Sequence, residues 1–197
     1  MLNDKILKIL ATSSVAIFTS SISLKAMEIN QISSFQIGKG EGYAERIRYH
    51  PESKSLLVTA SETGTVERIS ISDPFNLKKL VPFDLSGGNV TAVAVHKNLI
   101  AASIKEKKAD TPGNVKIFNN KGEKLAEYKT GALPDNVAFS PDGRYLLTAN
   151  EGEPSDDYKI DPEGSFTLID LSSGVQNANV KQITLNNIKM PAGARIV

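Results

Sequence analysis

The residues best suited to chemistry lie in one acidic segment, residues 150–164. It carries six carboxylates against a single lysine, Lys159. Carboxylate oxygens at this density suit a hard cation such as Ca²⁺, which takes about 6–8 oxygen ligands. Repulsion between close carboxylates would also disfavour an ordered loop without a counterion. The segment therefore predicts a Ca²⁺ site. The ligands that we expect are Glu151, Asp156, Asp157 and Asp161 through their side chains, with Asn150 as a carbonyl donor.

A solvated acidic loop is the competing interpretation of this segment. Pro154, Pro162 and Gly164 would then shape its turns. The spacing of the acidic residues does not match an EF-hand loop, which places Asp or Asn at alternate positions before a glycine and a distant Glu. The sequence favours the solvated loop, although so long a loop between two short strands argues for a role. Both interpretations stay open.

Composition excludes several other kinds of site. The 197 residues include no Cys and only two His, which excludes disulfides, thiolate metal sites and Cys nucleophiles and leaves little for a His-based triad. Lys plus Arg, 23, nearly cancels Asp plus Glu, 22, and 40% of the residues are hydrophobic. This balance excludes a basic nucleic-acid binder and a disordered acidic tail. We therefore expect no nucleic-acid partner.

The elements that must position the acidic segment recur about every 45 residues. Each of three units contains four short apolar runs, separated by turns rich in Gly, Pro, Asp and Asn. The first three runs of each unit are residues 44–49, 55–60 and 65–71; 89–95, 99–103 and 114–118; and 135–139, 145–150 and 165–171. The fourth runs are residues 78–85, 123–130 and 180–185.

Short runs rich in Val, Ile, Thr, Phe and Leu between such turns predict strands. Asp142-Gly143 is in addition a strong hairpin signal. The runs LLVTA (56–60) and YLLTA (145–149) are nearly apolar throughout, which predicts strands covered on both faces. A β-sandwich would also supply short strands but gives no reason for the repeat. We therefore predict an all-β fold of about three four-stranded, antiparallel β-propeller blades.

Charged and histidine-containing motifs in the turns are expected to be structural. His50 and His96 follow the first strand of successive units, which favours turn packing over catalysis. Ser86–Asn89 is expected to link two units and not to bind phosphate, because it lacks a following helix and a Lys. Lys105–Lys108 is expected to be a solvated loop tip. No Ser-His-Asp constellation is visible, and no catalytic residue is assigned.

Polar pairs also mark the start of two units. Glu45-Arg46 and Asp135-Asn136 fall where a blade begins, near the central channel of a closed propeller. Such residues could bind a small ligand, but hydrogen bonding from blade to blade is the favoured expectation.

The first segment predicts a secretory signal peptide, residues 1–26. Lys5 and Lys8 precede an uncharged stretch, residues 9–24, and Ala26 offers a small residue before a cleavage site. That stretch is short and hydroxylated for a membrane span, which needs about 20 mostly apolar residues. A retained N-terminal anchor is the alternative. We expect an exported chain, in the periplasm, at the cell surface or secreted, with no membrane span after cleavage.

The mature chain, residues 27–197, is expected to be part of a propeller domain. Its blades would span about residues 32–85, 86–130 and 131–185, with the start of a further blade at residues 191–197. A propeller needs at least about four blades to close. We therefore expect a fragment, whose open blade edges could self-associate or meet a completing partner chain.

The run from Gly131 to Leu171 resembles the choice-of-anchor I family of bacterial exported propellers. Its most distinctive stretch is ANEGEPSDDYKIDPEGS, Ala149–Ser165, with Lys159 at the variable place. The run SPDGRYLLTAN, residues 140–150, is less specific and is similar to YVTN-type and lactonase-like repeats. The family is similar to the mesenchyme-specific cell-surface glycoprotein group, and some members are described as alkaline phosphatases. The resemblance, from about residue 32 onward, implies longer relatives with about seven blades and a C-terminal anchor.

Two functions follow as hypotheses. The favoured one is a noncatalytic exported propeller module that binds a surface protein or a glycan through its blade loops and is stiffened by Ca²⁺. The alternative, which the resemblance implies, is a metal-dependent hydrolase of the phosphatase kind, with the acidic loop holding an activating metal. A propeller fold alone does not decide between them.

Overall fold

The computed structural model describes residues 29–86, 88–108 and 110–185. The chain divides into two compact units, Met1–Gln31 and Ile32–Val197, and the fold below is that of the second. The expected signal peptide, residues 1–26, and the expected start of a further blade at residues 191–197 lie outside the described residues. Within the described part of the chain, no helix is long and apolar enough to cross a bilayer.

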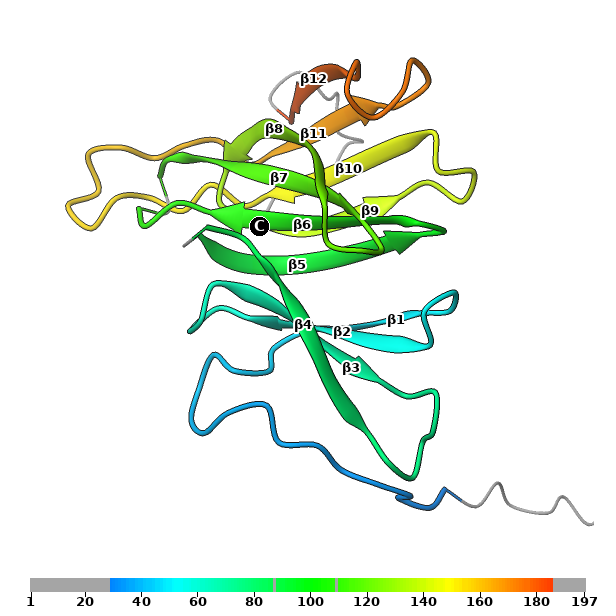
Figure 1. The fold of residues 1–197 in the computed structure, drawn as a ribbon. Coiled ribbons are helices and arrows are strands. Elements are labelled where there is room, and N and C mark those ends of the chain that lie inside the picture. The colour runs from blue at the N-terminus through cyan, green and yellow to red at the C-terminus, as the bar shows by residue number, and fades with distance from the viewer. Residues whose placement is uncertain (1–28, 87, 109, 186–197) are drawn as a thin grey trace, which may run out of the picture. The chain divides into compact units, whose positions relative to one another are not determined.

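The described fold is all-β, with three antiparallel sheets of four strands, each in the order of the chain (Figure 1). The first sheet contains β1 (Ile47–His50), β2 (Ser55–Ala60), β3 (Thr65–Ser70) and β4 (Lys78–Asp84). The second contains β5 (Asn89–His96), β6 (Leu99–Lys105), β7 (Pro112–Asn119) and β8 (Lys124–Ala132). The third contains β9 (Pro134–Phe139), β10 (Tyr145–Asn150), β11 (Ser165–Asp170) and β12 (Asn179–Thr184). The predicted all-β fold of four-stranded, propeller-like units is confirmed.

The turns between strands use the residues that their backbone geometry requires. In the β9–β10 hairpin, Gly143 has a φ of 72°, a left-handed conformation that glycine adopts without steric cost. Its N–H donates to the Ser140 carbonyl at 2.8 Å. The Ser140 hydroxyl donates to the Asp142 carboxylate at 2.6 Å. The hairpin predicted from Asp142-Gly143 is therefore confirmed.

Two apolar layers hold the three sheets together. Between the first and second sheets, Leu57, Val66 and Ile100 are almost fully buried, and the rings of Phe83 and Phe118 stack with centroids 5.4 Å apart. The layer between the second and third sheets is built from smaller side chains. Its buried members are Ala92, Ala94, Ala101, Val115, Ile117, Val137, Leu146, Ile169 and Leu171. Burying a large aliphatic side chain stabilises by about 1.5–3 kcal/mol, so these layers fix how neighbouring sheets sit.

The second sheet is covered on both faces, which explains its sequence. Neighbouring residues of β5 such as Ala92 and Val93 face opposite apolar layers. In β6, all residues from Ile100 to Ile104 are buried. A strand in this position has no solvent side, so its sequence does not alternate between apolar and polar residues.

The chain before β1 covers part of the outer face of the first sheet. Phe35 and Ile37 line an apolar pocket of about 420 Å³ together with Leu56 and Val58 of β2. The Ser33 hydroxyl donates to the Pro74 carbonyl at 2.7 Å, which ties this segment to the β3–β4 connection. The prediction that residues 56–60 are covered on both faces is confirmed.

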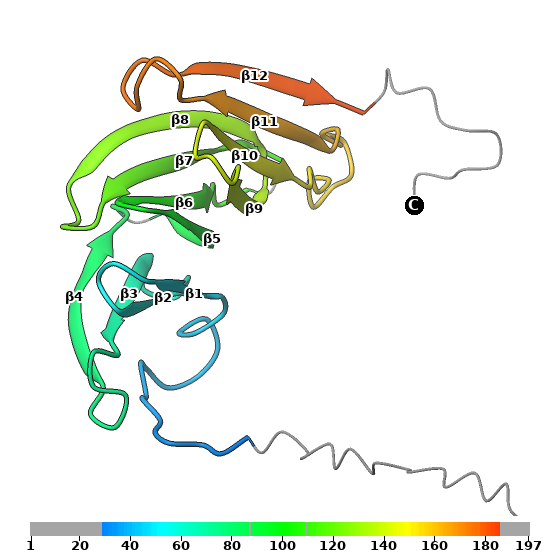
Figure 2. The same ribbon diagram turned by 90° about the vertical axis from the view of Figure 1, so that its right-hand side faces the viewer.

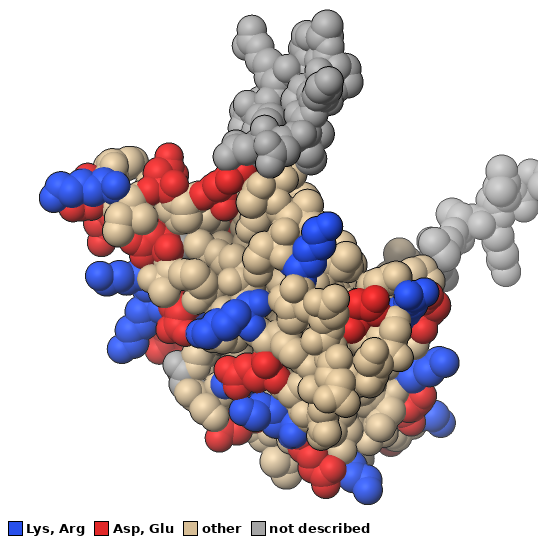
Figure 3. All heavy atoms as spheres, turned by 90° about the horizontal axis from the view of Figure 1, so that it is seen from above, with Lys and Arg blue, Asp and Glu red and all other residues tan. Residues whose placement is uncertain are grey.

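The matching prediction for β10 is wrong. Leu147 is 36% exposed and Phe166 of β11 is 39% exposed, because within the described residues no further sheet covers this face. Figure 3 looks onto the molecule from the side of the third sheet and shows an uncharged area with Lys, Arg, Asp and Glu around it. The apolar character of Tyr145–Ala149 therefore produces a sheet face that is open in the described residues.

The first strands of the three sheets lie next to one another. β1 contacts β5, and β5 contacts β9, while the fourth strands β4 and β8 lie on the outside in Figure 2. Residues near the beginning of each first strand are far apart in the sequence but are neighbours here.

Candidate functional site

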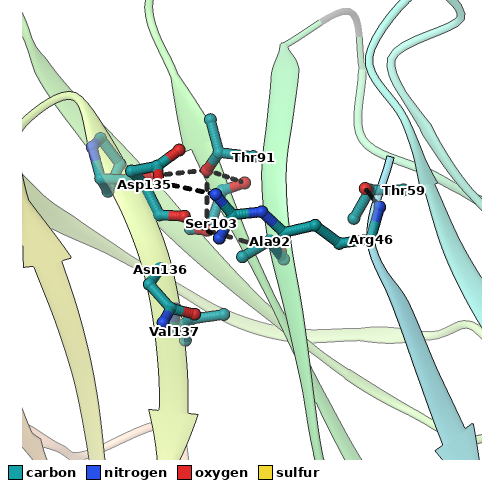
Figure 4. A network of polar contacts seen from close by, with 9 residues as sticks. Arg46, Thr59, Thr91, Ala92, Ser103, Asp135, Asn136 and Val137 are labelled. Atoms are coloured by element: carbon teal, nitrogen blue, oxygen red, sulfur yellow. Dashed lines mark hydrogen bonds and ion pairs between the residues drawn. The ribbon is translucent and has the colours of Figure 1, made fainter. Parts of the chain in front are cut away.

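A polar network joins the beginnings of the first strands (Figure 4). Arg46, just before β1, reaches past β5 to the third sheet. Its Nη1 donates to the Asp135 carbonyl oxygen and its Nη2 donates to the Asp135 carboxylate, both at 2.6 Å. The backbone N–H of Arg46 donates to the Thr59 hydroxyl of β2 at 3.0 Å. The arginine is therefore held at both ends, and the charge pair has a fixed place although it is partly exposed.

The second sheet joins the same network through β5. The Thr91 hydroxyl donates to the carbonyl of Pro134 in β9. It also lies 2.8 Å from the Ser103 hydroxyl of β6. The expected hydrogen bonding from blade to blade is confirmed for Arg46 and Asp135, whereas the Asn136 side chain accepts from the adjacent Val137 N–H.

A polar pocket of about 500 Å³ lies beside this network. All three sheets contribute to its wall, mostly through charged, hydroxyl or amide side chains. The lining residues are Glu45, Arg46, Ser61, Glu62, Asn89, Val90, Thr91, Lys105 and Asp135. None of these is aromatic, so recognition in this pocket depends on hydrogen bonds and charge.

A smaller pocket of about 340 Å³ adjoins the first one. Its wall comes from the start of β5, the end of β6 and the β6–β7 connection. The lining residues are Gly88, Asn89, Lys105, Glu106, Lys107, Lys108 and Thr111. Asn89 and Lys105 line both pockets and stand opposite each other in the pairing of β5 with β6. Two side chains on neighbouring strands therefore separate a mixed-charge pocket from a basic one.

Six residues that line the smaller pocket lie in the two motifs Ser86–Asn89 and Lys105–Lys108, to which the sequence assigned no binding role. Lys107 and Lys108 are exposed, as expected of a loop tip, but with Lys105 they also form the wall of a pocket. Asn89, expected only to link two units, lies at the boundary of both pockets. A signal for these pockets was present in the sequence. In each antiparallel unit, the connection between the second and third strands lies at the same end as the start of the first strand.

The acidic segment forms the β10–β11 connection, at the same end of the sheets as the β6–β7 connection (Figure 1), which lines the smaller pocket. Asn150, predicted as a carbonyl donor to calcium, is buried at its base. Its Oδ1 accepts from the Thr148 hydroxyl at 2.8 Å, and its Nδ2 donates to the Ser165 and Thr167 hydroxyls at 3.1 and 3.0 Å. The Glu151 N–H donates to the Leu133 carbonyl at 2.9 Å. These bonds fix the base of the loop.

The other predicted calcium ligands differ from Asn150 in burial. Glu151, Asp156, Asp157 and Asp161 are all exposed. Among the residues that the structure describes, no group of three or more His, Cys, Asp or Glu side chains is placed to hold a metal ion. The calcium site therefore stays a prediction from composition.

Asp157 uses its carboxylate within the loop. Its Oδ2 lies 2.9 Å from Lys159 Nζ, and its Oδ1 accepts from the Ser155 hydroxyl at 2.8 Å and from the Lys159 N–H at 3.2 Å. The bond from the Lys159 side chain, followed by that from Ser155, lowers the pKa of Asp157 below its ordinary value. Stabilisation of the charged form is therefore local, as in a self-contained turn.

The two histidines pack between successive sheets. His50 is fully buried. Its Nδ1 accepts from the Ser53 N–H at 3.1 Å, so Nε2 carries the proton and donates to the Lys97 carbonyl of the second sheet at 2.8 Å. His96 stands in the same place one unit later, with its ring 5.9 Å from that of Phe139 in the third sheet. Turn packing, as predicted, is confirmed for both histidines.

Consecutive four-stranded meanders, joined at their first strands around polar pockets, define a protein of the β-propeller class. Solved structures agree with this fold. The chain is similar to the hydrazine synthase of Kuenenia stuttgartiensis, with a TM-score of 0.60 and 14% identity over 73% of this chain and 42% of that one. It is also similar to the periplasmic gluconolactonase of Pseudomonas aeruginosa, with a TM-score of 0.50 and 18% identity over 73% of this chain and 43% of that one. The chain thus spans less than half of each structure.

The sequence places the chain in a family. The profile of the choice-of-anchor I domain matches residues 45–195, and the chain belongs to this family. No curated protein matches its sequence.

Proposed function

We propose that this chain is a noncatalytic binding module of an exported β-propeller protein and that it takes a small, hydroxyl-rich ligand, a glycan or glycan fragment, in the polar pocket beside Arg46. The observation that carries the proposal is the composition of that pocket. Its wall combines carboxylates, cations, hydroxyls and an amide from all three sheets. Such a wall offers both donors and acceptors, which a sugar with many hydroxyl groups requires.

The Arg46–Asp135 pair supports binding through preorganisation. The guanidinium is held by two contacts to Asp135, and the Arg46 backbone N–H is held by the Thr59 hydroxyl. A wall that is already ordered loses little conformational entropy when a ligand binds. Partly exposed polar groups beside it then exchange water for ligand hydroxyls.

The competing function, a metal-dependent hydrolase, has less support. It depends on an activating metal in the acidic loop. Within the described residues, no three carboxylate or histidine side chains are grouped for that purpose. Neither histidine lines the pocket, so the wall lacks the commonest general base.

Export is part of the proposal. A domain of the choice-of-anchor kind fits a chain destined for the cell surface or the surrounding medium, and the signal peptide expected at residues 1–26 agrees with that destination. A ligand outside the cytoplasm, such as a glycan of a cell surface, is then within reach.

A saccharide titration of the full chain tests the proposal. The ligands are lactose, cellobiose, maltose and their aldonic acids lactobionate, cellobionate and maltobionate. Binding is measured by calorimetry and by changes in backbone amide chemical shifts. We expect at least one of them to bind and to shift the amides of Ser61, Asn89 and Thr91. Asn89→Ala should weaken binding, and Asn76→Ala, which changes an exposed residue of the β3–β4 connection, should not. No binding by any of the six, or binding that Asn89→Ala leaves intact, would contradict the proposal.

A further inference from the structure

We infer that the ligand is a sugar acid, with its hydroxyl-bearing part in the larger pocket and a single carboxylate in the smaller, basic one. This inference rests on the proposed function and specifies its ligand class. Asn89 and Lys105 line both pockets, so a ligand that contacts these two side chains is at the boundary of both.

The charge of the smaller pocket calls for an anion. Lys105, Lys107 and Lys108 line it, against one carboxylate, Glu106. The Asn114 amide donates to Glu106 at 3.3 Å and occupies one of its oxygens. The other carboxylate of the β6–β7 connection, Asp110, does not line the pocket and accepts from the Thr111 hydroxyl at 3.2 Å. Three ammonium groups around a small space favour a ligand carboxylate.

The larger pocket limits how much negative charge the ligand can carry. Glu45, Glu62 and Asp135 line it, and only Asp135 has an arginine partner there, Arg46. Charges of like sign a few ångströms apart repel, so a ligand with anionic groups along its whole length would be disfavoured. A ligand with one anionic group at one end is therefore compatible with the charges of both pockets.

The lack of aromatic side chains in the walls of both pockets favours a sugar acid over other ligands. No aromatic side chain lines either pocket. A nucleobase therefore finds no ring to stack on. A neutral sugar likewise has only hydrogen bonds, which largely replace those that it makes with water. A carboxylate adds charge-assisted hydrogen bonds, which are about twice as strong as neutral ones.

The neutral and acidic members of each saccharide pair provide the test. With the full chain at low salt, we expect lactobionate to bind at least about tenfold more tightly than lactose, since each 1.4 kcal/mol corresponds to a factor of ten. The preference should shrink in Lys105→Gln and in the double variant Lys107→Gln, Lys108→Gln. It should persist in Lys121→Gln, an exposed lysine of the β7–β8 turn. Added salt should weaken lactobionate binding more than lactose binding.

The outcomes separate this inference from the proposed function. If each acid binds as its neutral partner does, the sugar-acid assignment fails while the glycan-binding function stands. If acetate or inorganic phosphate binds as tightly as lactobionate, the basic pocket is a plain anion site and the assignment fails. If none of the six saccharides binds, both the proposed function and the sugar-acid assignment fail.

Discussion

The β6–β7 and β10–β11 connections occupy equivalent places in the second and third sheets, yet they carry opposite charges. At the first, Lys105, the last residue of β6, together with Lys107 and Lys108 of the connection outnumbers two carboxylates. In the second, six carboxylates face a single lysine, Lys159. Both connections leave the same end of the sheets (Figure 1). Equivalent topology therefore does not imply equivalent chemistry, since strands fix where a loop begins and the loop sequence decides what it presents.

The two connections also differ in what their charges contact. The lysines of β6–β7 line a pocket. The β10–β11 connection folds onto itself, with the Ser155 N–H donating to the Ile160 carbonyl at 2.7 Å and the Tyr158 N–H to the Ser155 carbonyl at 2.8 Å. Its Asp157 and Lys159 form an internal pair. High charge density thus leads to a pocket wall in one loop and to a local turn in the other.

Substitution of the matched glycines at the ends of the two loops should give the largest difference. In Gly113→Ala, the new Cβ would come within 2.5 Å of the Ile104 carbonyl oxygen and of a Pro134 ring carbon. Neither atom is the end of a flexible side chain, so we expect a loss of unfolding free energy of about 3 kcal/mol. In Gly164→Ala the nearest atom is the Glu151 carbonyl oxygen at 3.3 Å, and we expect a loss below about 0.5 kcal/mol.

Urea unfolding of both glycine variants, followed by circular dichroism, measures this difference. Equal losses for Gly113→Ala and Gly164→Ala would show that the bases of the two loops are packed alike. The two connections would then not differ in how they are packed.

Removal of the buried polar residue below each loop should give a smaller difference. Asn150→Ala removes the partner of Thr148, Ser165 and Thr167 at once. Thr167 keeps its bonds with the Gly131 N–H and the Gln182 side chain, whereas the buried Thr148 hydroxyl loses its bond to Asn150. A buried hydroxyl that loses its partner is costly, so we expect a loss of about 2 kcal/mol. Ser103 stands at the matching place in the second sheet, and its hydroxyl contacts Thr91 Oγ1 at 2.8 Å. Ser103→Ala also removes the longer bond from the Ser103 hydroxyl to the Ala92 carbonyl at 3.4 Å. Because the Thr91 hydroxyl keeps its bond to the Pro134 carbonyl and little space is opened, the loss should be about 1 kcal/mol.

The same unfolding assay, with Thr63→Ala in the exposed β2–β3 turn as a control, checks this order. A larger loss for Ser103→Ala than for Asn150→Ala would mean that the acidic loop is anchored elsewhere.

The sequence predicted the strands well because their causes are local. Gly143 with a positive φ and short β-branched runs act within a few residues. The exposure of Leu147 was missed because burial depends on what packs against a sheet, which the strand's own sequence does not determine. The sequence placed Glu45-Arg46 and Asp135 at the starts of two units, but it did not show which other side chains join them in a pocket, for a related reason. Arg46 and Asp135 meet across 89 residues of sequence, and the side chains that line the pocket beside them come from three separate sheets.

Added calcium should have the smallest effect on the free energy of unfolding. This measurement tests whether the acidic loop differs from the basic one in function as well as in charge. An ion that binds only the native state raises the unfolding free energy by about 2.7 kcal/mol at a hundredfold excess over its dissociation constant. We expect no such rise in the full chain when thermal unfolding in excess Ca²⁺ is compared with unfolding in EDTA. The described carboxylates are not grouped to hold a metal, and the Asp157 carboxylate is already paired with Lys159. A rise that disappears in the double variant Asp157→Asn, Asp161→Asn but persists in Glu123→Gln would establish a calcium site. The acidic loop would then be a ligand-binding element in its own right, and the contrast between the two connections would be one of ligand sign alone.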